Sequence, residues 1–402
     1  MAALDSVNGS GRQLFANTFR SCPPAETLAR IAPWLGPAGI TRVAVVTGLD
    51  WIGIPVVMVS RPAGRSLSVT QGKGPTLEAA KVSGLMEALE HYCAESIDAP
   101  LRYGSARELA ERGHASCIPR AALRGSGSLQ DEPLTWIAGQ SLLDGSTVFV
   151  PFDLVHLDYR LPLAPSARHF LASSNGLASG NTEPEATCHA LFELIEREHT
   201  QRFYDIDPLA QRARRVDPAT VLDPVARELL DKLEAARVVA GVWDLSSELG
   251  VPCFLCDLLD AERGDFRSLS RARGFGCHSD RRVALTRALC EAAQSRLTMI
   301  AGSRDDISRR ELAEARSLEG WSYAAQQLSG DALPLRSFEA APSQSFASFE
   351  QERDWLLSAI ERAGFGPPIV VSLSRPEHPF AVVRVLVPGM RAPHARARER
   401  AS

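Results

Sequence analysis

Two glutamates three residues apart, Glu87 and Glu90, lie in the segment SGLMEALEHYCAE, whose apolar residues repeat with the period of a helix. Residues three apart lie on the same side of an α-helix. Paired carboxylates can bind divalent cations or transfer protons. A single Glu-x-x-Glu pair is also common on solvated helix faces. This pair alone therefore does not distinguish a functional site from a solvent-exposed helix face.

The same pattern returns twice further along the chain. Three segments align without gaps from a residue typical of helix N-caps, which is Thr76, Thr182 or Asp280. The aligned residues are Ala80, Ala186 and Ala284, then Leu85, Leu191 and Leu289, then Glu87, Glu193 and Glu291, and finally Glu90, Glu196 and Gln294. Unrelated surface residues need not repeat their offsets, so the repeat favours a shared function over three solvated helix faces.

The aligned polar residues fall on one border of each apolar stripe when successive residues are rotated by about 100°. These borders carry Ser83, Glu87 and Glu90 in the first helix, Glu185, His189, Glu193 and Glu196 in the second, and Arg287, Glu291 and Gln294 in the third. If the borders converge, the crowded carboxylates raise one another's pKa values unless cations neutralise them. Mg²⁺ typically takes a few carboxylates, waters and substrate phosphates. The sequence therefore predicts a Mg²⁺–nucleotide site between helices.

Cations and glycines near these helices could meet the phosphates. Lys73, Arg197 and Arg296 are candidate phosphate ligands. The glycine-rich stretches QGKGPT, LASGNT and GFGCHSD are expected to form turns near the caps, where helix N-termini bind anions. The GKG at 72–74 lacks the following Ser or Thr of a Walker A loop, and the GFG at 274–276 lacks the last glycine of a dinucleotide fingerprint. A nucleotide site here would be of another type.

The elements that position these residues alternate between strands and long helices. Apolar, β-branched runs predict strands at Thr41–Thr47, Ile54–Val59, Ser66–Val69, Thr147–Val150, Val238–Trp243, Pro252–Leu258, Ile369–Leu373 and Ala381–Val387. Helical periodicity covers Thr76–Ser96, Thr182–Tyr204, Asp280–Ile300, Arg309–Ser317 and Phe349–Ala363. Residues 105–132 and 328–348 are predicted loops. The pattern predicts a mixed α/β (α+β) fold built from repeated strand–strand–helix units.

Composition limits the function classes. The chain has 402 residues, of which 45% are hydrophobic, enough for a large core, and its net charge of −4 gives no argument for nucleic acid. Its first residues lack the apolar segment of a signal peptide, and no apolar run approaches the ~18 residues of a membrane helix. We therefore expect a cytoplasmic protein without a membrane partner. The one CxxC pair, Cys253 and Cys256, falls in a predicted strand, where residues three apart face opposite sides.

The blocks QGKG, SGLMEALE, SNGLASGNTEPEATCHALFELIER, ALCEAAQSR and GSRDD, in this order, resemble the hallmark blocks of the YcaO family. The resemblance implies a YcaO-type α/β fold with long helices lining an ATP site, and ATP and Mg²⁺ as cofactors. It implies that ATP activates a backbone amide oxygen in a peptide or protein. With the candidate Lys73, the expected cofactor-binding residues are Lys73, Ser83, Ser174, Asn181, Glu185, Gln294 and Arg296. The expected metal ligands are Glu87, Glu90, Glu185, Glu193 and Glu196, and the expected catalytic set is Glu87, Glu90, Glu193, Glu196 and Arg197.

The N-terminal stretch TFRSCPPAETLARIAPWLGPAGITRVAVVTGLDWIGIPVVMVSRP resembles the branch of this family that is encoded beside TfuA proteins and is linked to backbone thioamide formation. The C-terminus lacks the alternating-proline tail of azoline-forming cyclodehydratases. A further departure is His91, where many members have arginine. We expect residues 1–65 to form an N-terminal extension packed on a catalytic domain at 66–390, with a disordered basic tail at 391–402.

Three functions remain open from the sequence. Thioamide formation requires a TfuA-like partner protein, a precursor peptide or protein, and sulfide or another sulfur donor. An azoline-forming cyclodehydratase would use a side chain of the substrate as the nucleophile. A non-catalytic scaffold would only bind a precursor peptide, and a homodimer is possible in each case. Cys93, Cys188 and Cys290 are interpreted as buried inert thiols, and His189 as a packed histidine rather than a general base.

Overall fold

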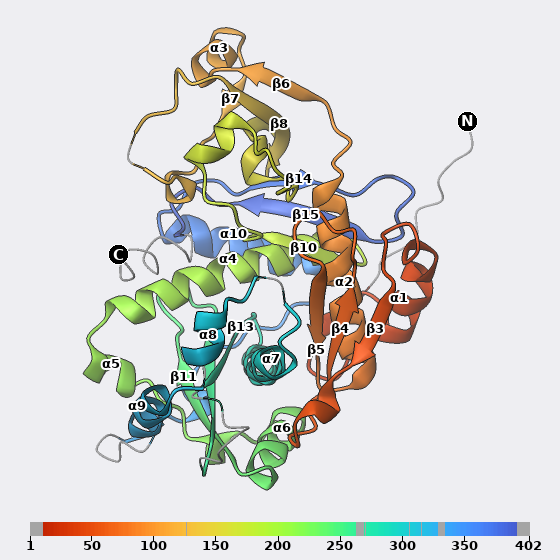
Figure 1. Cartoon of the computed structure of the whole chain (residues 1–402). Coiled ribbons are helices and arrows are strands. Elements are labelled where there is room, and N and C mark those ends of the chain that lie inside the picture. The colour runs from red at the N-terminus through yellow and green to blue at the C-terminus, as the bar shows by residue number, and fades with distance from the viewer. Residues whose placement is uncertain are drawn as a thin grey trace.

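A computed structural model of the chain has a mixed α/β architecture, as predicted (Figure 1). The structure describes residues 11–125, 127–262, 269, 271–304, 306–314, 316–328 and 334–391. The predicted basic tail therefore lies outside the described residues except for Arg391. Within the described residues, no helix combines the length and the apolar character that a membrane span requires.

The three aligned segments form long helices whose bounds match the prediction. They are α2 (Leu77–Glu95), α4 (Glu183–Asp205) and α7 (Arg281–Ala301). Thr76, Thr182 and Asp280 are the N-caps, and each side chain accepts a hydrogen bond from a backbone N–H of the first turn. The capping residues therefore fix where each helix begins, and with it the direction of its glutamate-bearing border.

Each long helix packs on a sheet. Helix α2 packs on β4 (Val56–Ser60) and β5 (Val69–Lys73) of a three-stranded antiparallel sheet completed by β3 (Arg42–Val45). Helix α7 packs on β12 (Cys253–Asp260) and β13 (Ala272–Cys277) of another, completed by β11 (Val238–Asp244). Helix α4 packs on β10 and β15 in a seven-stranded sheet of the described chain. Its strands are β10 (Leu177–Gly180), β15 (Ala381–Leu386), β14 (Ile369–Ser372), β8 (Leu134–Ser141), β9 (Thr147–Pro151) and β7 (Ala115–Ser116), with β6 (Leu101–Gly104) paired to β8.

Shorter elements complete the described fold. The helices are α1 (Pro24–Ile31), α3 (Ala106–Glu111), α5 (Pro208–Arg212), α6 (Pro224–Ala235), α8 (Arg309–Glu314), α9 (Leu318–Leu328) and α10 (Phe349–Arg362). A short hairpin pairs β1 (Gln13–Leu14) with β2 (Phe19–Arg20). Single 3₁₀ turns occur at Ala32–Trp34, Thr47–Leu49, Arg120–Ala122, Phe152–Leu154, Pro165–His169, Pro218–Thr220 and Phe338–Ala340. The predicted loop at 105–132 therefore contains α3 and β7.

The glycine-rich stretches are largely strands rather than the predicted turns. The predicted strand Ser66–Val69 is also wrong, because β5 begins at Val69 and continues through the glycine-rich sequence to Lys73. A Cβ atom at Gly72 would lie 2.0 Å from the carbonyl oxygen of Ala80. These strand glycines therefore let a strand approach the following helix closely. Strands β10 and β13 were not predicted, because their glycine-rich sequences were interpreted as turns.

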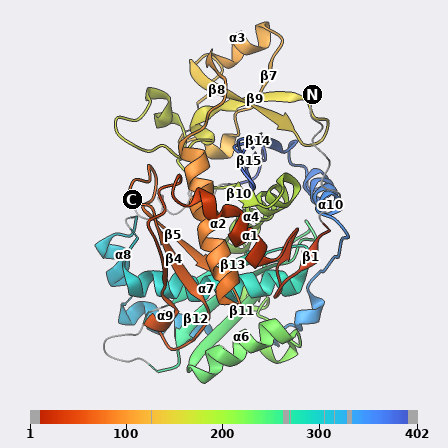
Figure 2. The same cartoon turned by 90° about the vertical axis from the view of Figure 1, so that its right-hand side faces the viewer.

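The three units contact one another in a closed ring. Helix α2 contacts β10 of the second unit, α4 contacts β13 of the third, and α7 contacts β5 of the first. In Figure 1, α7 is seen end on between β5 and β13, with α4 running above it. The view in Figure 2 shows α7 lengthwise, with α2 crossing it. This arrangement turns the border of each helix toward the other two units.

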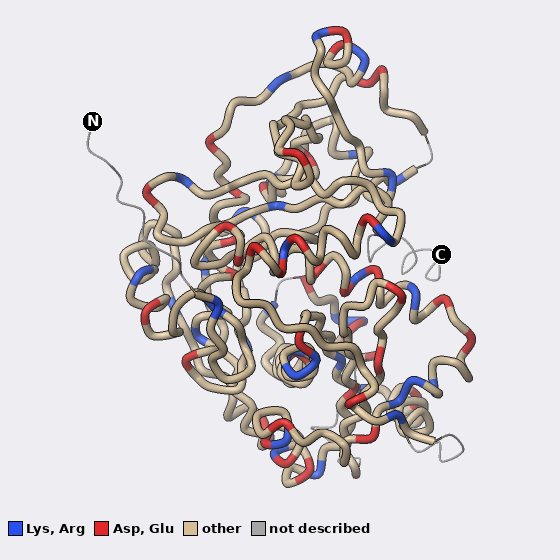
Figure 3. Tube along the Cα trace, turned by 180° about the vertical axis from the view of Figure 1, so that it is seen from behind, with Lys and Arg blue, Asp and Glu red and all other residues tan. Residues whose placement is uncertain are grey.

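Buried residues form the core between these layers. Cys253 packs in one hydrophobic cluster and Cys256 in another, so the CxxC pair faces opposite sides of β12, as predicted. Ile31 and Ile54, from the predicted N-terminal extension, also belong to core clusters. The boundary at residue 65 stays a prediction. Acidic and basic residues are interspersed over the whole described trace (Figure 3).

Candidate functional site

The glutamate-bearing borders of the three helices meet, as the sequence predicts. His189 on α4 lies 3.1 Å from Arg287 on α7, measured between Nε2 and Nη2. Glu291 on α7 pairs with the ammonium group of Lys73 on β5 at 2.8 Å. These side chains come from segments that are far apart in the sequence, so the ring of units creates one shared polar region.

Ser179 on β10 joins this region to α2. Its backbone N–H and its hydroxyl both donate to Oε1 of Glu90, at 2.8 and 2.7 Å. Burial raises the pKa of Glu90 to about 8, although these two donors oppose the shift. Sequence reasoning missed Ser179, because its position depends on the packing of α2 against a strand of another unit.

Glu87 lies one helical turn before Glu90 and is half-buried. Burial raises the pKa of Glu87 to about 7, and the negative charges of Glu193 and Glu291 add to the effect, whereas Lys73 opposes it. This interaction places carboxylates of α2, α4 and α7 within electrostatic reach of one another. The site therefore holds a carboxyl group that is only partly ionised at neutral pH.

Arg197 balances the glutamates of α4. Its guanidinium lies 3.3 Å from Glu196 and 3.9 Å from Glu193. Burial nevertheless raises the pKa of Glu193 and raises that of Glu196 to about 7. Burial acts in the same direction on Glu291, but Lys73 and Arg197 outweigh it and hold the pKa of Glu291 below its ordinary value. The ionised carboxylate is thus the one with a lysine in contact.

Glu185 is fully engaged by the N-terminal segment and its own helix start. Its carboxylate accepts hydrogen bonds from the backbone N–H of Ser21 at 3.0 Å and from the Ser21 hydroxyl at 2.7 Å. Asn181 donates to both oxygens at 3.3 and 3.4 Å, and Arg20 lies 3.5 Å away. Burial lowers the pKa of Arg20, which Glu185 partly opposes. Sequence reasoning missed Arg20 and Ser21, because a short hairpin has no periodic pattern.

The remaining predicted nucleotide-binding residues differ in position. Ser83 is half-buried on the border of α2, and Ser174 is exposed just before β10. Gln294 donates from Nε2 to the backbone carbonyl of Gln71 at 3.2 Å, and Gln71 precedes Lys73 by two residues on β5. These residues are consistent with a nucleotide lying across the ring of units.

Arg296 is not brought to the glutamates by any contact among the described residues. Its side chain is buried and lies 3.3 Å from Asp50 and 3.0 Å from Asp260. Trp51 covers the guanidinium, with its ring 5.6 Å away. These contacts tie α7 to the first and third units, and a direct contact with a nucleotide stays a prediction without structural support.

The histidines and cysteines near the site are uncharged, and they are buried except for His189, which is half-buried. Burial, together with the charge of Arg287, lowers the pKa of His189 well below its ordinary value. Burial lowers the pKa of His91 to about 4. Burial also raises the thiol pKa values of Cys93 and Cys290 to about 12, and that of Cys188 well above the ordinary range. Protonated, buried thiols are poor nucleophiles, in agreement with the interpretation as inert thiols.

The residue set suits a Mg²⁺ ion that arrives with phosphates rather than a preformed metal cage. Among the described residues, no three acidic, histidine or cysteine side chains are grouped closely enough to hold a metal ion. Lys73 and Arg197 stand between the carboxylates as counter-ions. Because Mg²⁺ usually keeps waters and uses substrate phosphates as ligands, a mixture of carboxylates and cations fits a Mg²⁺–nucleotide better than a bare ion.

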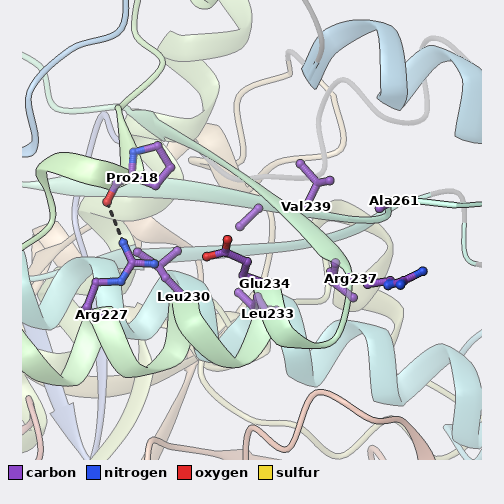
Figure 4. A pocket seen from close by; sticks show the side chains of 10 residues that line it. Pro218, Arg227, Leu230, Leu233, Glu234, Arg237, Val239 and Ala261 are labelled. Atoms are coloured by element: carbon purple, nitrogen blue, oxygen red, sulfur yellow. Dashed lines mark hydrogen bonds between the residues drawn. The ribbon is translucent and has the colours of Figure 1, made fainter.

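Two cavities occur elsewhere on the described surface. One of about 340 Å³ lies against α6 and β11 and is lined by residues such as Arg227, Glu234 and Val239 (Figure 4). Another of about 450 Å³ lies at the starts of α6 and α7, next to Asp223 and Asp280. Neither is lined by any predicted site residue, so the candidate site is defined by the converging side chains.

Known proteins resemble this chain in both sequence and fold. A family model described as a YcaO cyclodehydratase that binds ATP and Mg²⁺ matches residues 71–391. A protein of Rhizobium leguminosarum bv. trifolii, named for its place in the tfuA 3′ region, is 36% identical over 375 residues, which are 92% of this chain and 88% of that protein.

Among solved structures, YcaO from Methanopyrus kandleri, bound with AMPPCP and Mg²⁺, matches with a TM-score of 0.74 at 21% identity, covering 98% of this chain and 97% of that one. A heterocyclase in complex with substrate and cofactor matches with a TM-score of 0.78 at 22% identity over 95% of this chain. This chain spans about half of that heterocyclase, 54% of its length. At such identities the two likenesses establish the fold.

Proposed function

Because this chain belongs to the YcaO family of ATP- and Mg²⁺-binding enzymes, we propose that it uses Mg²⁺-ATP to convert a backbone amide of a peptide or protein into a thioamide. The observation that carries the ATP-dependent part is the meeting of half-buried glutamates from three helices with Lys73 and Arg197. The relative encoded in a tfuA region, together with the N-terminal resemblance, supports the thioamide part and a TfuA-like partner.

The proposed reaction joins a sulfur nucleophile to an activated amide. Hydrosulfide sulfur bonds to the amide carbon, and the carbonyl electron pair moves to oxygen. That oxyanion bonds to the γ-phosphorus of ATP, and ADP leaves. The carbon–oxygen bond then breaks, phosphate departs with the former amide oxygen and a proton, and a C=S bond remains. Mg²⁺, when bound, neutralises phosphate charge during this transfer.

The residues of this chain would bind and orient the two substrates. Glu87, Glu90, Glu193 and Glu196 would hold Mg²⁺ or its waters, and Glu185 could join them only by exchanging one of its present donors. Lys73 and Arg197 would move from their carboxylate partners toward the phosphates. Ser83, Ser174, Asn181 and Gln294 would hydrogen-bond the nucleotide. The buried, protonated thiols favour sulfide delivered from outside over a persulfide on this chain.

Azoline-forming cyclodehydration is the second candidate, because the family model carries the name cyclodehydratase. There the nucleophile is a Cys, Ser or Thr side chain of the substrate. Co-expression with the neighbouring genes, followed by intact mass of candidate precursor peptides, separates the two reactions. Replacement of oxygen by sulfur raises the peptide mass, whereas ring closure lowers it by one water. A gain in mass supports thioamide formation, and a loss supports cyclodehydration.

A non-catalytic scaffold is tested by nucleotide binding. We expect Glu193→Gln to weaken Mg²⁺-ATP binding by roughly tenfold or more, or about 1.4 kcal/mol, because a neutral amide cannot replace a carboxylate beside Mg²⁺. Glu183→Gln is the matched control, since Glu183 is exposed on the same helix. Isothermal titration calorimetry measures both. If the unaltered protein neither binds nor hydrolyses Mg²⁺-ATP with partner and substrate present, the scaffold is favoured. Equal affinities of both variants and the unaltered protein would instead mean that the three aligned helices are a packing repeat.

A further inference from the structure

Arg287 differs from three other cations of the candidate site, Lys73, Arg197 and Arg20, in having no anionic partner among the described residues. Lys73 pairs with Glu291, Arg197 with Glu196, and Arg20 with Glu185. Arg287 forms no ion pair with any residue in the described part of the chain. Its Nε atom is buried and has no hydrogen-bond partner there. A half-buried guanidinium without a counter-ion is unusual, because its desolvation is not offset.

Arg287 lies near negatively charged side chains even though none of them contacts it. The charge of Arg287 opposes the rise in the pKa of Glu193 and Glu196, and it also helps to lower the pKa of Glu291. The guanidinium therefore lies within electrostatic reach of carboxylates from α4 and α7, yet it contacts none of them. The cation and these carboxylates are therefore near one another without a direct contact.

His189 holds Arg287 in place without neutralising it. Nη2 of Arg287 lies 3.1 Å from Nε2 of His189, which is neutral and can accept a hydrogen bond. A carboxylate at this position would cancel the charge of the guanidinium, whereas a neutral imidazole orients it and keeps the charge available. Arg287 also lowers the pKa of the nearby Arg20, so a second positive group adds to the local potential.

The three aligned helices place these residues at equivalent positions. Ser83 on α2, His189 on α4 and Arg287 on α7 each follow their N-cap by seven residues. Ser83 is itself a proposed nucleotide ligand, so the equivalent position on α7 faces the same region. Arginine at this position supplies a planar set of donors that matches phosphoryl oxygens.

We propose that Arg287, oriented by His189, binds a phosphoryl group of the bound nucleotide beside the glutamates of α4 and α7. This inference rests on the proposed function, since it needs an ATP-binding site. Carboxylates that take up Mg²⁺ would repel phosphate oxygens if no cation lay beside them. Arg287 is a cation that no described carboxylate contacts, and unlike Arg384, which donates to the backbone carbonyl of Ser173, it lies on one of the three aligned helices. The ligand chemistry is a phosphoryl oxygen, which could come from the nucleotide or from free phosphate.

The test compares Arg287→Met and Arg287→Lys with the unaltered full chain. Calorimetric titrations with Mg²⁺-ATP, Mg²⁺-ADP and inorganic phosphate measure affinity, and thermal unfolding of the ligand-free proteins measures stability. We expect Arg287→Met to lose roughly 10- to 100-fold in Mg²⁺-ATP affinity, as for one charge-assisted bidentate contact, with Arg287→Lys between. The melting temperature of ligand-free Arg287→Met should be equal to or higher than that of the unaltered protein, because no ion pair is removed.

Arg273→Met is the matched control. Arg273 is also half-buried and lies on β13 of the same unit, but it binds Asp257 through two contacts of 2.7 Å. This control should lower the melting temperature and leave Mg²⁺-ATP affinity unchanged. A loss for ATP but not for free phosphate supports a nucleotide contact, and a matching loss for phosphate places the product there as well.

Two negative results are distinguishable. If the unaltered protein binds Mg²⁺-ATP and Arg287→Met binds ATP, ADP and phosphate equally well, the role of Arg287 is overturned and the proposed function stands. If the unaltered protein binds no Mg²⁺-ATP with partner and substrate present, the proposed function fails and the inference fails with it.

Discussion

At the scale of single residues, the glutamates of one site differ in their ionisation because their partners differ. The pKa of Glu90 rises to about 8 and those of Glu87 and Glu196 to about 7, mainly through burial. Glu291 stays ionised because Lys73 contacts it. The ligand-free site therefore carries protons at neutral pH that a divalent cation would have to displace.

These raised pKa values predict that the ligand-free protein loses stability as pH rises from about 4.5 to about 8, most clearly above about 6.5, where the lowered pKa of His189 no longer opposes the loss. The folded state binds more protons than the unfolded state between the ordinary glutamate pKa of 4.5 and the folded values of about 7 and 8. The free energy of unfolding therefore falls as pH rises through this window. Urea unfolding at several pH values measures it. His189 has a lowered pKa and acts in the opposite direction, but only around and below pH 6.5.

The variant Glu90→Gln isolates the largest contribution. Glutamine keeps an oxygen that can accept from Ser179 but has no proton to lose. We expect its stability to decline less with pH, and the variant to be more stable than the unaltered protein at the alkaline end. Glu183→Gln, on the exposed face of α4, should leave the pH profile unchanged. A profile that is the same with and without Glu90 would contradict this assignment.

At the scale of elements, each unit is built on a close contact between a strand glycine and a helix alanine. A Cβ at Gly72 would lie 2.0 Å from the carbonyl oxygen of Ala80, and one at Gly276 would lie 2.1 Å from that of Ala284. The alanine that the three segments share is thus the residue against which the strand packs. The alignment therefore reflects this packing as well as the glutamates. Because each glutamate follows the packed alanine by seven residues, the contact also fixes the position of the glutamate relative to the strand.

Gly72→Ala should separate β5 from α2 and weaken both stability and nucleotide binding. The added methyl group would meet backbone atoms, which cannot move aside as a flexible side chain would. We expect a loss of roughly 1–3 kcal/mol in the free energy of unfolding, with weaker Mg²⁺-ATP binding because Glu87 and Glu90 shift with α2. Urea unfolding and calorimetric titration measure the two effects.

Gly48→Ala is the control for this change, because a Cβ at Gly48 has no atom within 4 Å. Its stability should match that of the unaltered protein. If Gly72→Ala were as stable as Gly48→Ala, the close contact between β5 and α2 would not be essential to the unit.

The elements also explain what the sequence could predict. Helices α2, α4 and α7 were predictable because caps and apolar periodicity are local signals. Strands β10 and β13 were not, because their glycines resemble turns until a packed helix explains them. In the site, Glu87 and Glu193 followed from the repeat. Ser179, Arg20 and Ser21 depend on pairing between distant segments, for which a single sequence carries no periodic signal.

At the scale of the whole molecule, the two ends of the described chain are joined through a buried ion pair. Arg12 donates to Glu352 on α10 at 2.6 and 3.1 Å, and both side chains are sealed from solvent. Ser279, just before the cap of α7, also donates to Glu352. The matched family region begins only at residue 71, yet this segment reaches the start of α7 and continues to Ser21, which holds Glu185. The N-terminal segment thus supports the site from outside that region.

Arg12→Met should therefore destabilise the whole chain. Removing one partner leaves the buried carboxylate of Glu352 uncompensated, which typically costs about 3–5 kcal/mol. The double variant Arg12→Met/Glu352→Met should recover most of this loss, because neither buried charge remains. Arg353→Met is the control, since Arg353 is more exposed and, among the described residues, forms an ion pair only with its neighbour Asp354. Urea unfolding measures all four proteins. If Arg12→Met unfolded at the same urea concentration as Arg353→Met, the N-terminal segment would be a dispensable extension; a single cooperative transition at lower urea would make it part of the folded core.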